Sequence, residues 1–326
     1  MLGAVISEQL RDQSLGAGGV VVLDLPVNTL SAILLELEAV NSTANDFPSM
    51  EEFAGLLSRV RVTYRGHDVI SLSGDQLLAV NHLYRSLAPV YHQLDTPASS
   101  VLDLVLPVVF GRGVLDAQWG MPPTKRGELQ LEVTAASALG QFSSVSLTVV
   151  TVEWPGVESE GVLQQRPVQW TPPAVGLQYV DLPVGQRYAA IVLRSPSVPS
   201  GTSRVTTVDR VELIVDGLER VYTGIKWEVA SALSRWLAGD YLQYAASDRL
   251  ENLAGAYTQY ARTASMTPVR PFLANWSMLL FDSAYDGSQM LDASEFKSLR
   301  LGVECGDTNA VTIIPLNFLS ADVFRE

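Results

Sequence analysis

The sequence is poor in the residues that build disulfides, metal sites and nucleic-acid contacts. Its 326 residues include one cysteine and three histidines, and 35 acidic residues outnumber 22 basic ones, for a formal net charge of −13. One cysteine excludes an intrachain disulfide framework and indicates production in the cytosol. The negative charge disfavours phosphate-driven binding, so we expect no specific nucleic-acid partner.

Long apolar runs and targeting signals are also missing. No uncharged apolar run reaches the roughly 18 residues that suggest a membrane span. The first residues, MLGAVISEQLRDQSLGAGG, have no basic region ahead of their apolar residues and turn polar at Ser7. Because a secretory signal peptide has the opposite pattern, we expect neither a signal peptide nor a membrane span.

Charge of either sign is sparse. Charged residues make up 17% of the chain and hydrophobic residues 47%, with 24 glycines and 17 prolines. This composition is typical of a turn-rich globular protein with a weakly charged surface, which neighbouring molecules could cover. The length suits two domains of roughly 150 residues, each large enough to bury a core.

Alternation of apolar and polar residues dominates the chain and predicts half-buried antiparallel strands. In LLELEA, for example, Leu35 and Leu37 alternate with Glu36 and Glu38. The other segments of this kind are RVRVTY (59–64), ELQLEV (128–133), VSLTVVTVEW (145–154), DRVELIVDG (209–217), NWSMLLFDS (275–283), SLRLGV (298–303) and AVTIIPLNFL (310–319).

Two stretches change to helical spacing. Residues 73–94 begin at Ser73, a residue type favoured as N-cap, and place Leu77, Val80 and Tyr84 on one stripe. A second helical insertion runs from Lys226 to about 264, and Gly239 and Gly255 are expected to divide it. Its apolar positions at helical spacing are Trp227, Ala230, Leu233, Trp236 and Leu237.

The chain is expected to comprise an arm (1–19), a first domain (20–154), a Pro-rich linker (155–173) and a second domain (174–326). Within the arm, Leu2, Ile6 and Leu10 recur at helical spacing on a segment too short to fold alone. Such a stripe needs a surface, which could be its own domain, a neighbouring subunit or a lipid headgroup layer. The lone Arg11 disfavours a strong lipid anchor.

The two domains repeat one order of elements. Asp-Leu-Pro-Val occurs at 24–27 and at 181–184, each time between apolar strand-like runs. Each copy is followed by a strand, a turn, a second strand, a helical insertion, a strand ending on phenylalanine and two closing strands. The offsets are 157 at Asp24/Asp181, 151 at Gly66/Gly217, 171 at Phe110/Phe281 and 170 at Leu129/Leu299. We therefore predict a mainly β protein made of two tandem eight-stranded jelly rolls with helical insertions.

Motifs that suggest a ligand or a reaction fail in their context. The glycines of GAGGVVVLD (16–24) precede a strand, whereas a dinucleotide fingerprint has them after a strand. A calcium-like loop from Asp282 through Asp286 and Gly287 has Ala284 and Ala293 where ligands should stand. We interpret it as a surface loop with an Asp-Gly turn.

Nucleophiles and metal ligands are equally isolated. Cys305 lacks the basic or helix-start surroundings that lower a thiol pKa, so we expect a small buried residue. His67, His82 and His92 have no ligand pattern around them. No Gly-x-Ser-x-Gly occurs either. We predict no catalytic, cofactor-binding or metal-binding residue and no enzyme activity.

The duplicated order and the segment RVRVTYRGHDVISLSGDQLLAVNHLY (59–84) resemble the double-jelly-roll major capsid proteins of tailless icosahedral viruses, including membrane-containing bacteriophages. The resemblance spans about residues 20–320. It implies a homotrimer of pseudo-hexagonal outline that tiles a virion capsid after synthesis in the host cytoplasm. It also implies contacts with neighbouring capsomers, and contacts of the arm with minor capsid proteins or an internal membrane, and it supplies no catalytic residue.

Two other hypotheses remain open. A secreted carbohydrate-binding or carbohydrate-active β-sandwich protein would show a signal peptide, calcium or disulfides, and an exposed aromatic strip, of which the first three are missing. The many carboxylates leave a glycosidase with paired acids open. A minor capsid or spike protein would more often carry one receptor-binding roll on a fibrous stalk.

Six tryptophans could supply the aromatic strip that a carbohydrate-binding protein needs. Trp119 and Trp170 fall in neither helical nor strand patterns. The other four fall in patterns that favour core or interface packing, and they are Trp154, Trp227, Trp236 and Trp276.

Overall fold

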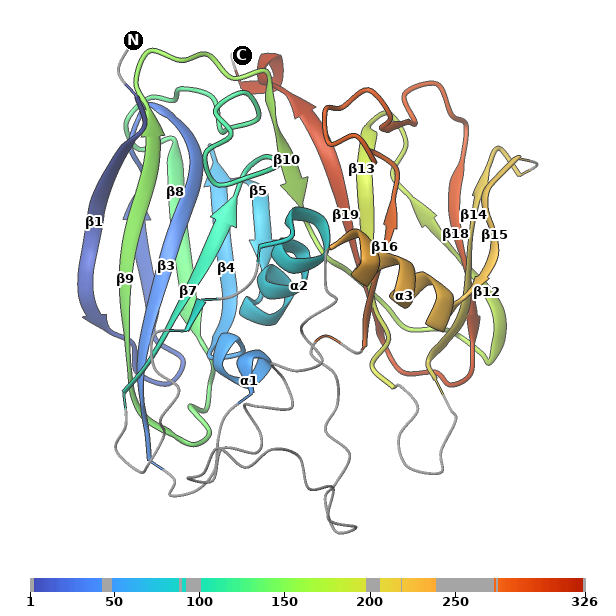
Figure 1. Cartoon of the computed structure of the whole chain (residues 1–326), viewed down its shortest axis with the longest axis horizontal. Helices are drawn as coiled ribbons and strands as arrows, with labels where there is room; N and C mark the ends of the chain where they lie inside the picture. Colours follow the sequence, from blue (N-terminus) through green and yellow to red (C-terminus); the bar gives the residue numbers. More distant parts are fainter. Residues whose placement is uncertain are drawn as a thin grey trace.

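The computed structural model describes residues 3–42, 49–87, 90–91, 101–197, 206–217, 219–238, 273 and 275–324. As predicted, the protein is mainly β, and Figure 1 shows two β-rich halves standing side by side. The first half contains β1 (Val5–Ser14), β2 (Val20–Asp24), β3 (Thr29–Asn41), α1 (Met50–Ala54), β4 (Leu57–Tyr64), β5 (His67–Leu72), α2 (Gly74–Arg85), β6 (Val90–Tyr91), β7 (Val101–Val109), β8 (Leu129–Ala135) and β9 (Phe142–Trp154).

The second half repeats the main order of these elements. It contains β10 (Gly161–Gln165), β11 (Val168–Trp170), β12 (Gly176–Leu182), β13 (Arg187–Arg194), β14 (Val208–Val215), β15 (Glu219–Lys226), α3 (Trp227–Leu237), β16 (Trp276–Leu280), β17 (Leu291–Asp292), β18 (Leu299–Cys305), β19 (Val311–Ser320) and the 3₁₀ turn η1 (Ala321–Phe324).

Each half is a sandwich of two sheets. In the first half the order β1-β9-β3-β7-β6 faces the order β5-β4-β8-β2, and in the second the order β16-β13-β19-β10 faces β12-β18-β14-β15. The strands pair antiparallel except where Gln165 of β10 meets Ile70 of β5 in parallel. That contact joins one four-stranded sheet of each half, and with β11 beside β19 and β17 beside β13 the joined sheet has ten strands. The alternating residues predicted to face inward, such as Leu35, Val62 and Leu131, are fully buried.

Strand register confirms the duplication. Asp24 lies opposite Gln130 on β8, and Asp181 lies opposite Arg300 on β18. In both copies the aspartate carboxylate accepts a hydrogen bond from its partner's side chain, at 2.9 Å. The repeated Asp-Leu-Pro-Val motif therefore marks the end of the same edge strand in each half.

The turns between β4 and β5 and between β14 and β15 repeat in the same way. Arg65 and Gly66 have φ values of 47° and 81°, and Asp216 and Gly217 have values of 51° and 75°. Two successive positive φ values are required by the tight hairpin turn that matches strand twist, and glycine adopts them without strain.

The helical interpretation of the N-terminal arm is wrong. Residues Val5–Ser14 form β1 and pair with β9 from Val5↔Glu153 to Ser14↔Ser146. The backbone of β1 completes the edge of an existing sheet, and this pairing does not depend on side-chain spacing. Leu10 packs against the first core, Ile6 is 65% exposed, and Leu2 lies outside the described residues.

The stretch expected to be a linker also contains strands. β10 and β11 both pair with β19 on either side of Arg166 and Pro167. Four of the five β10 residues are buried, so the segment GVLQQ shows no alternation that would have predicted a strand. β1 and β10 thus occupy the same place in the two halves, next to β9 and β19 respectively.

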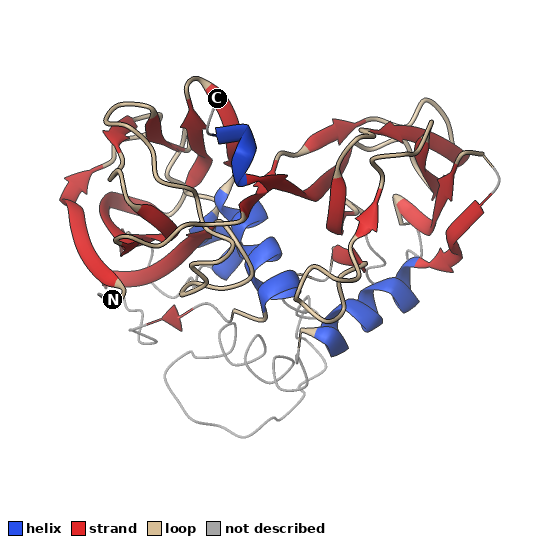
Figure 2. Ribbon diagram, turned by 90° about the horizontal axis from the view of Figure 1, so that it is seen from above, coloured by secondary structure: helices blue, strands red, loops and turns tan. Residues whose placement is uncertain are grey.

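The two helical insertions are confirmed in the part that the structure describes. α2 begins after Ser73 and ends at Arg85, earlier than expected, with Ser86 in a left-handed conformation at φ 54°. Leu77, Val80 and Tyr84 are buried as predicted. α3 covers Trp227–Leu237, while residues 239–272 of the second insertion lie outside the described residues. Figure 2 shows α2 between the two halves, with α3 along the second.

Candidate functional site: the junction and the exposed apolar surfaces

The junction between the halves is built on α2. Asp75, in the first turn of α2, accepts a 3.0 Å hydrogen bond from Nη1 of Arg194 on β13. At the other end of the helix, the ring of Tyr84 lies 5.5 Å from that of Tyr285, in the loop after β16. One apolar cluster runs from α2 into the second half as far as Trp276. The halves therefore share a core and do not merely touch.

A buried arginine fastens α2 to the end of β7. Nε of Arg85 donates to the carbonyl oxygen of Gly111, and Nη2 donates to that of Val109, both at 2.9 Å. Nη1 donates to Oδ1 of Asn81 at 3.2 Å. Burial lowers the pKa of Arg85 to about 10, so it remains charged at neutral pH. Its position in the last turn also suits the helix dipole.

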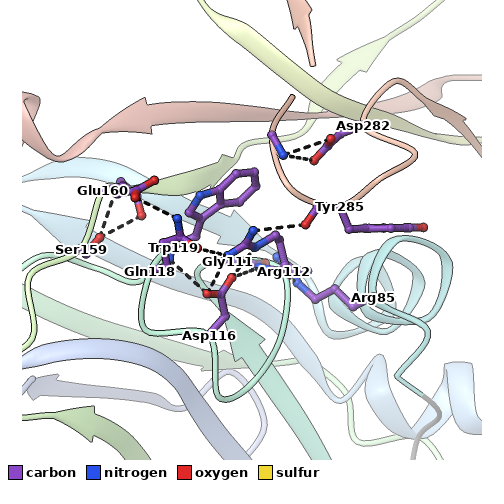
Figure 3. Close-up of polar contacts among 12 residues, drawn as sticks. Arg85, Gly111, Arg112, Asp116, Gln118, Trp119, Ser159, Glu160, Asp282 and Tyr285 are labelled. Atoms are coloured by element: carbon purple, nitrogen blue, oxygen red, sulfur yellow. Dashed lines mark hydrogen bonds and ion pairs between the residues drawn. The ribbon is translucent and has the colours of Figure 1, made fainter. Parts of the chain in front are cut away.

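A second arginine connects the loop after β7 with the second half (Figure 3). Arg112 grips Asp116 with two hydrogen bonds of 2.7 and 3.0 Å and donates to the carbonyl oxygen of Tyr285 at 3.2 Å. Its guanidinium also lies over the ring of Trp119, 4.3 Å from the centroid. This bidentate pair with a stacked ring is the geometry for which arginine is suited and lysine is not.

The Arg112–Asp116 pair keeps both groups ionised. Burial alone would raise the pKa of the Asp116 carboxyl, but the hydrogen bonds and charge of Arg112 outweigh it and hold that pKa below its ordinary value. The hydrogen bond with Asp116 in turn raises the pKa of Arg112. The pair thus contributes to the cohesion of the junction over the neutral range.

Asp116→Asn is expected to lower stability at neutral pH and to flatten its dependence on pH in the acid range. The lowered pKa means that the ionised Asp116 stabilises the fold fully above about pH 4, and that this contribution is lost as pH falls through the folded-state pKa. Denaturant unfolding between about pH 7 and pH 3 measures the effect. Glu38→Gln, which removes an exposed carboxylate of β3, is the control. Equal pH slopes for Asp116→Asn and the unmodified protein would contradict the expectation.

A cleft of about 460 Å³ opens beside this cluster. Arg187, its cation, donates to the carbonyl oxygen of Gly287 at 2.6 Å and lies 5.8 Å from the ring centroid of Phe318. Glu160 accepts a 2.8 Å hydrogen bond from Gln118. These polar groups are used within the chain, and the cleft has no histidine, cysteine or lysine in its lining, which is Trp119, Glu160, Arg187, Asp286, Gly287, Ser288 and Phe318. Its hydroxyl and carboxylates, on Ser288, Glu160 and Asp286, therefore have no imidazole, thiol or ammonium group beside them in the lining.

The loop that resembled a calcium site uses its carboxylates internally. Asp282 is buried, and its two oxygens accept hydrogen bonds from the Gly287 N–H at 3.1 and 3.0 Å. Asp286 accepts from the Ser288 N–H at 2.8 Å, as in an Asx turn. Across the described part of the chain, no three His, Cys, Asp or Glu residues are grouped to hold a metal ion.

The histidines are scattered. His67 is exposed at the start of β5, His82 is buried on α2, and His92 lies outside the described residues.

The other residues considered from sequence are structural. Gly19 donates to the carbonyl oxygen of Gly16 at 2.8 Å, so the glycine run forms a tight turn that leads into β2. Cys305 is 1% exposed, and burial raises the pKa of its thiol to about 11, with smaller contributions from Asp307 and Asp209. A buried, protonated thiol is a poor nucleophile.

The tryptophans do not form an exposed strip. All six lie in described segments, and five are buried or half-buried. Trp236, on α3, is the exposed one, at 64%.

Exposed apolar side chains gather on α3 and on the two edge strands. On α3 they are Val229, Leu233, Trp236 and Leu237, which we call the α3 stripe; their exposed fractions lie between 39% and 64%. β2 exposes Val20 and Val22, and β12 exposes Leu177 and Tyr179 at the corresponding register positions. Large apolar side chains exposed in groups mark surfaces that bind other proteins.

The sequence did not reveal the arginine cluster at the junction. Arg85 and Arg112 belong to no motif, and their acceptors are carbonyl oxygens and side chains brought together by the fold. The available signal was a basic residue in the last turn of a predicted helix, which is too common to single one out. In the part of the molecule that the structure describes, no helix is long and apolar enough to cross a membrane.

Comparison with known proteins finds matches in structure alone. No protein-family model and no curated sequence matches the chain. The crystal structure of the STIV MCP superposes with a TM-score of 0.68 at 14% identity, over 97% of both chains. The major capsid protein P2 from bacteriophage PM2 gives 0.64 at 15% identity, over 97% of this chain and 98% of that one. A chain of the PBCV-1 virus capsid gives 0.59 at 12% identity, over 97% and 93%. The chain therefore has the double-jelly-roll fold of these capsid proteins.

Proposed function

We propose that the protein is the major capsid protein of an icosahedral virus, with a structural and not a catalytic role. The observation that carries this proposal is the match of nearly the whole chain, over both rolls and their junction, to solved capsid proteins. The exposed apolar groups on α3, β2 and β12 add support, because an isolated monomer gains nothing from them.

In this proposal three copies form a capsomer of pseudo-hexagonal outline, with two rolls from each copy, and capsomers tile the faces of the shell. The virion capsid is then the location of the protein, after synthesis in the host cytoplasm. Of the N-terminal residues expected to reach a neighbour or an internal membrane, Ile6 is exposed and Leu10 packs inward. We therefore assign any such contact to Ile6 and the exposed Val5.

The mass of the purified protein in solution tests the proposal. Light scattering at low and high concentration is expected to show a species near three times 35.3 kDa, and electron microscopy is expected to show sheets or shells on concentration. A monomer at every concentration would contradict it. A carbohydrate-binding sandwich would instead need an exposed aromatic strip, whereas Trp236 is the single exposed tryptophan.

A further inference from the structure

Helices α2 and α3 can be compared residue by residue, because the β-hairpins before them have the same strand register. Val60 pairs with Leu72 in the first half, and Val211 pairs with Ile225 in the second. The next residue in each case, Ser73 or Lys226, is the N-cap of the helix. Leu72 to Ile225 and Ser73 to Lys226 are both offsets of 153, so position n of α2 corresponds to position n + 153 of α3.

At this offset the α3 stripe corresponds to a buried face of α2. On α2 the exposed fractions are 8% or less, whereas on α3 they are 39% or more. Three of the four α2 residues are apolar or aromatic, so α2 and α3 both have a mainly apolar face at these positions. The pairs are Gln76 and Val229, Val80 and Leu233, Leu83 and Trp236, and Tyr84 and Leu237.

α2 packs on its own half and also on β13 and β16 of the second half. Val192 of β13 pairs with Met278 of β16 and with Ile314 of β19, and all three point away from the second core into the cluster shared with α2. Trp276 belongs to the same surface. These four residues are at most 2% exposed.

The first half has an equivalent apolar surface that is more exposed. Leu34 of β3 pairs with Pro107 of β7 and with Val150 of β9, which is the register of Val192, Met278 and Ile314. Two residues further along β3, Glu36 pairs with Val105. In the second half Arg194 pairs with Trp276 at the equivalent position. Leu34, Val105, Pro107 and Val150 are apolar and only half-buried. An outward sheet face that meets only water is normally polar.

We infer that the α3 stripe docks on the outer face of β3, β7 and β9 of a second copy, as α2 packs on β13 and β16 within one chain. This inference rests on the proposed function and names the surfaces through which copies associate. Figure 1 shows α3 beside the second half in the position that α2 takes beside the first. The contact joins two different surfaces, so it runs head to tail and closes into a ring when the rotation permits.

One intrachain interaction is not repeated at the proposed contact, and it provides a test. The ion pair Asp75–Arg194 at the junction corresponds to Glu228 on α3 and Glu36 on β3, both exposed. The docked copies therefore bring two carboxylates together, where repulsion opposes association. Glu228→Arg is expected to lower the dissociation constant of the assembly by roughly 3- to 10-fold at low salt. Glu36→Arg is expected to do the same, and Glu36→Arg with Glu228→Arg is expected to lose the gain.

Trp236→Ser is the complementary loss of contact. Because exposed aromatic anchors dominate binding energy, it is expected to weaken association by roughly 100-fold without lowering the unfolding temperature of the dilute monomer. Val221→Ser, at a 41% exposed valine of β15 outside the stripe, is the matched control and is expected to associate normally. Sedimentation velocity over a concentration series, with the full chain, measures all variants.

The outcomes separate this inference from the proposed function. An unmodified protein that never associates overturns the proposed function and the inference with it. An unmodified protein that forms trimers, with Trp236→Ser forming them equally well, overturns the inference alone. A lower monomer stability of Trp236→Ser with unchanged association shows that the stripe is covered within the chain and also overturns it. Weaker association of Glu228→Arg contradicts the register.

Discussion

Trp276→Ala is expected to lower the free energy of unfolding by about 3–5 kcal/mol. Trp276 is fully buried, pairs with Arg194 across β16 and β13, and lies 5.5 Å below the Arg194 guanidinium. It belongs to the apolar cluster that runs from α2 into the second half. Its removal leaves a cavity where the halves meet, so the loss includes the packing of both. Urea unfolding of the dilute monomer measures the change.

Two further variants make this prediction specific. The indole N–H of Trp276 is buried and finds no hydrogen-bond partner among the described residues. Trp276→Phe keeps most of the aromatic contact and removes this unsatisfied donor, so it is expected to lose less than half as much stability as alanine. Trp236→Ala, at an exposed position, is expected to stay within about 0.5 kcal/mol of the unmodified monomer. A loss below about 1 kcal/mol for Trp276→Ala would show that the junction is not the common core that we describe.

Gly111→Ala is expected to cost about 3 kcal/mol, at the upper end for overpacking. A Cβ at this position would lie 2.0 Å from the carbonyl oxygen of Trp119 and 2.7 Å from its Cβ. Backbone atoms cannot turn away as a side chain can, so the loop after β7 must move. That movement disturbs the carbonyl oxygen of Gly111, which accepts a hydrogen bond from Arg85. Thermal and urea unfolding measure the loss.

Gly113→Ala is the matched control for this substitution. Gly113 lies two residues further along the same loop and needs no positive φ, and a Cβ added there would have no atom within 4 Å. The alanine is expected to change stability by less than about 0.5 kcal/mol. Similar results for the two alanines would mean that the approach of Gly111 to Trp119 is looser than the structure shows.

The junction inside the chain also indicates how two copies of the protein can associate. The duplication repeated the helix and the face on which it docks, so the chain carries two helices and two such faces. One helix, α2, packs on one of these faces within the chain, and the contacts Asp75–Arg194 and Tyr84–Tyr285 hold it there. Within the described residues, the other helix and face stay partly exposed and belong to different halves of the molecule, which is the condition for head-to-tail association.

Several parts of the fold followed from sequence because they depend on local periodicity. Leu35, Val62 and Leu131 alternate with polar residues and are buried as predicted. Ser73 precedes α2 as expected from its capping preference. The repeated Asp-Leu-Pro-Val predicted equivalent positions, and the pairing of Asp24 with Gln130 and of Asp181 with Arg300 confirms them.

The strands β1 and β10 were missed for two different reasons. The residues of β1 lie at an edge and are mostly exposed, so they do not show the apolar–polar alternation of a strand that packs on a core. The residues of β10 are nearly all buried, and a strand buried on both faces does not alternate. In both cases the strand is specified by backbone hydrogen bonds to a partner more than a hundred residues away, β9 or β19.

The sequence by itself determined the strand-rich architecture and its duplication, because side-chain alternation, capping and turn residues act between near neighbours. Only the tertiary structure decided which apolar surfaces are buried within the chain and which are exposed. Leu83 and Trp236 stand at equivalent positions on equivalent helices, yet one is 1% exposed and the other 64%. The difference is what lies in front of each helix, and that depends on how the two halves pack and not on either helix's own residues.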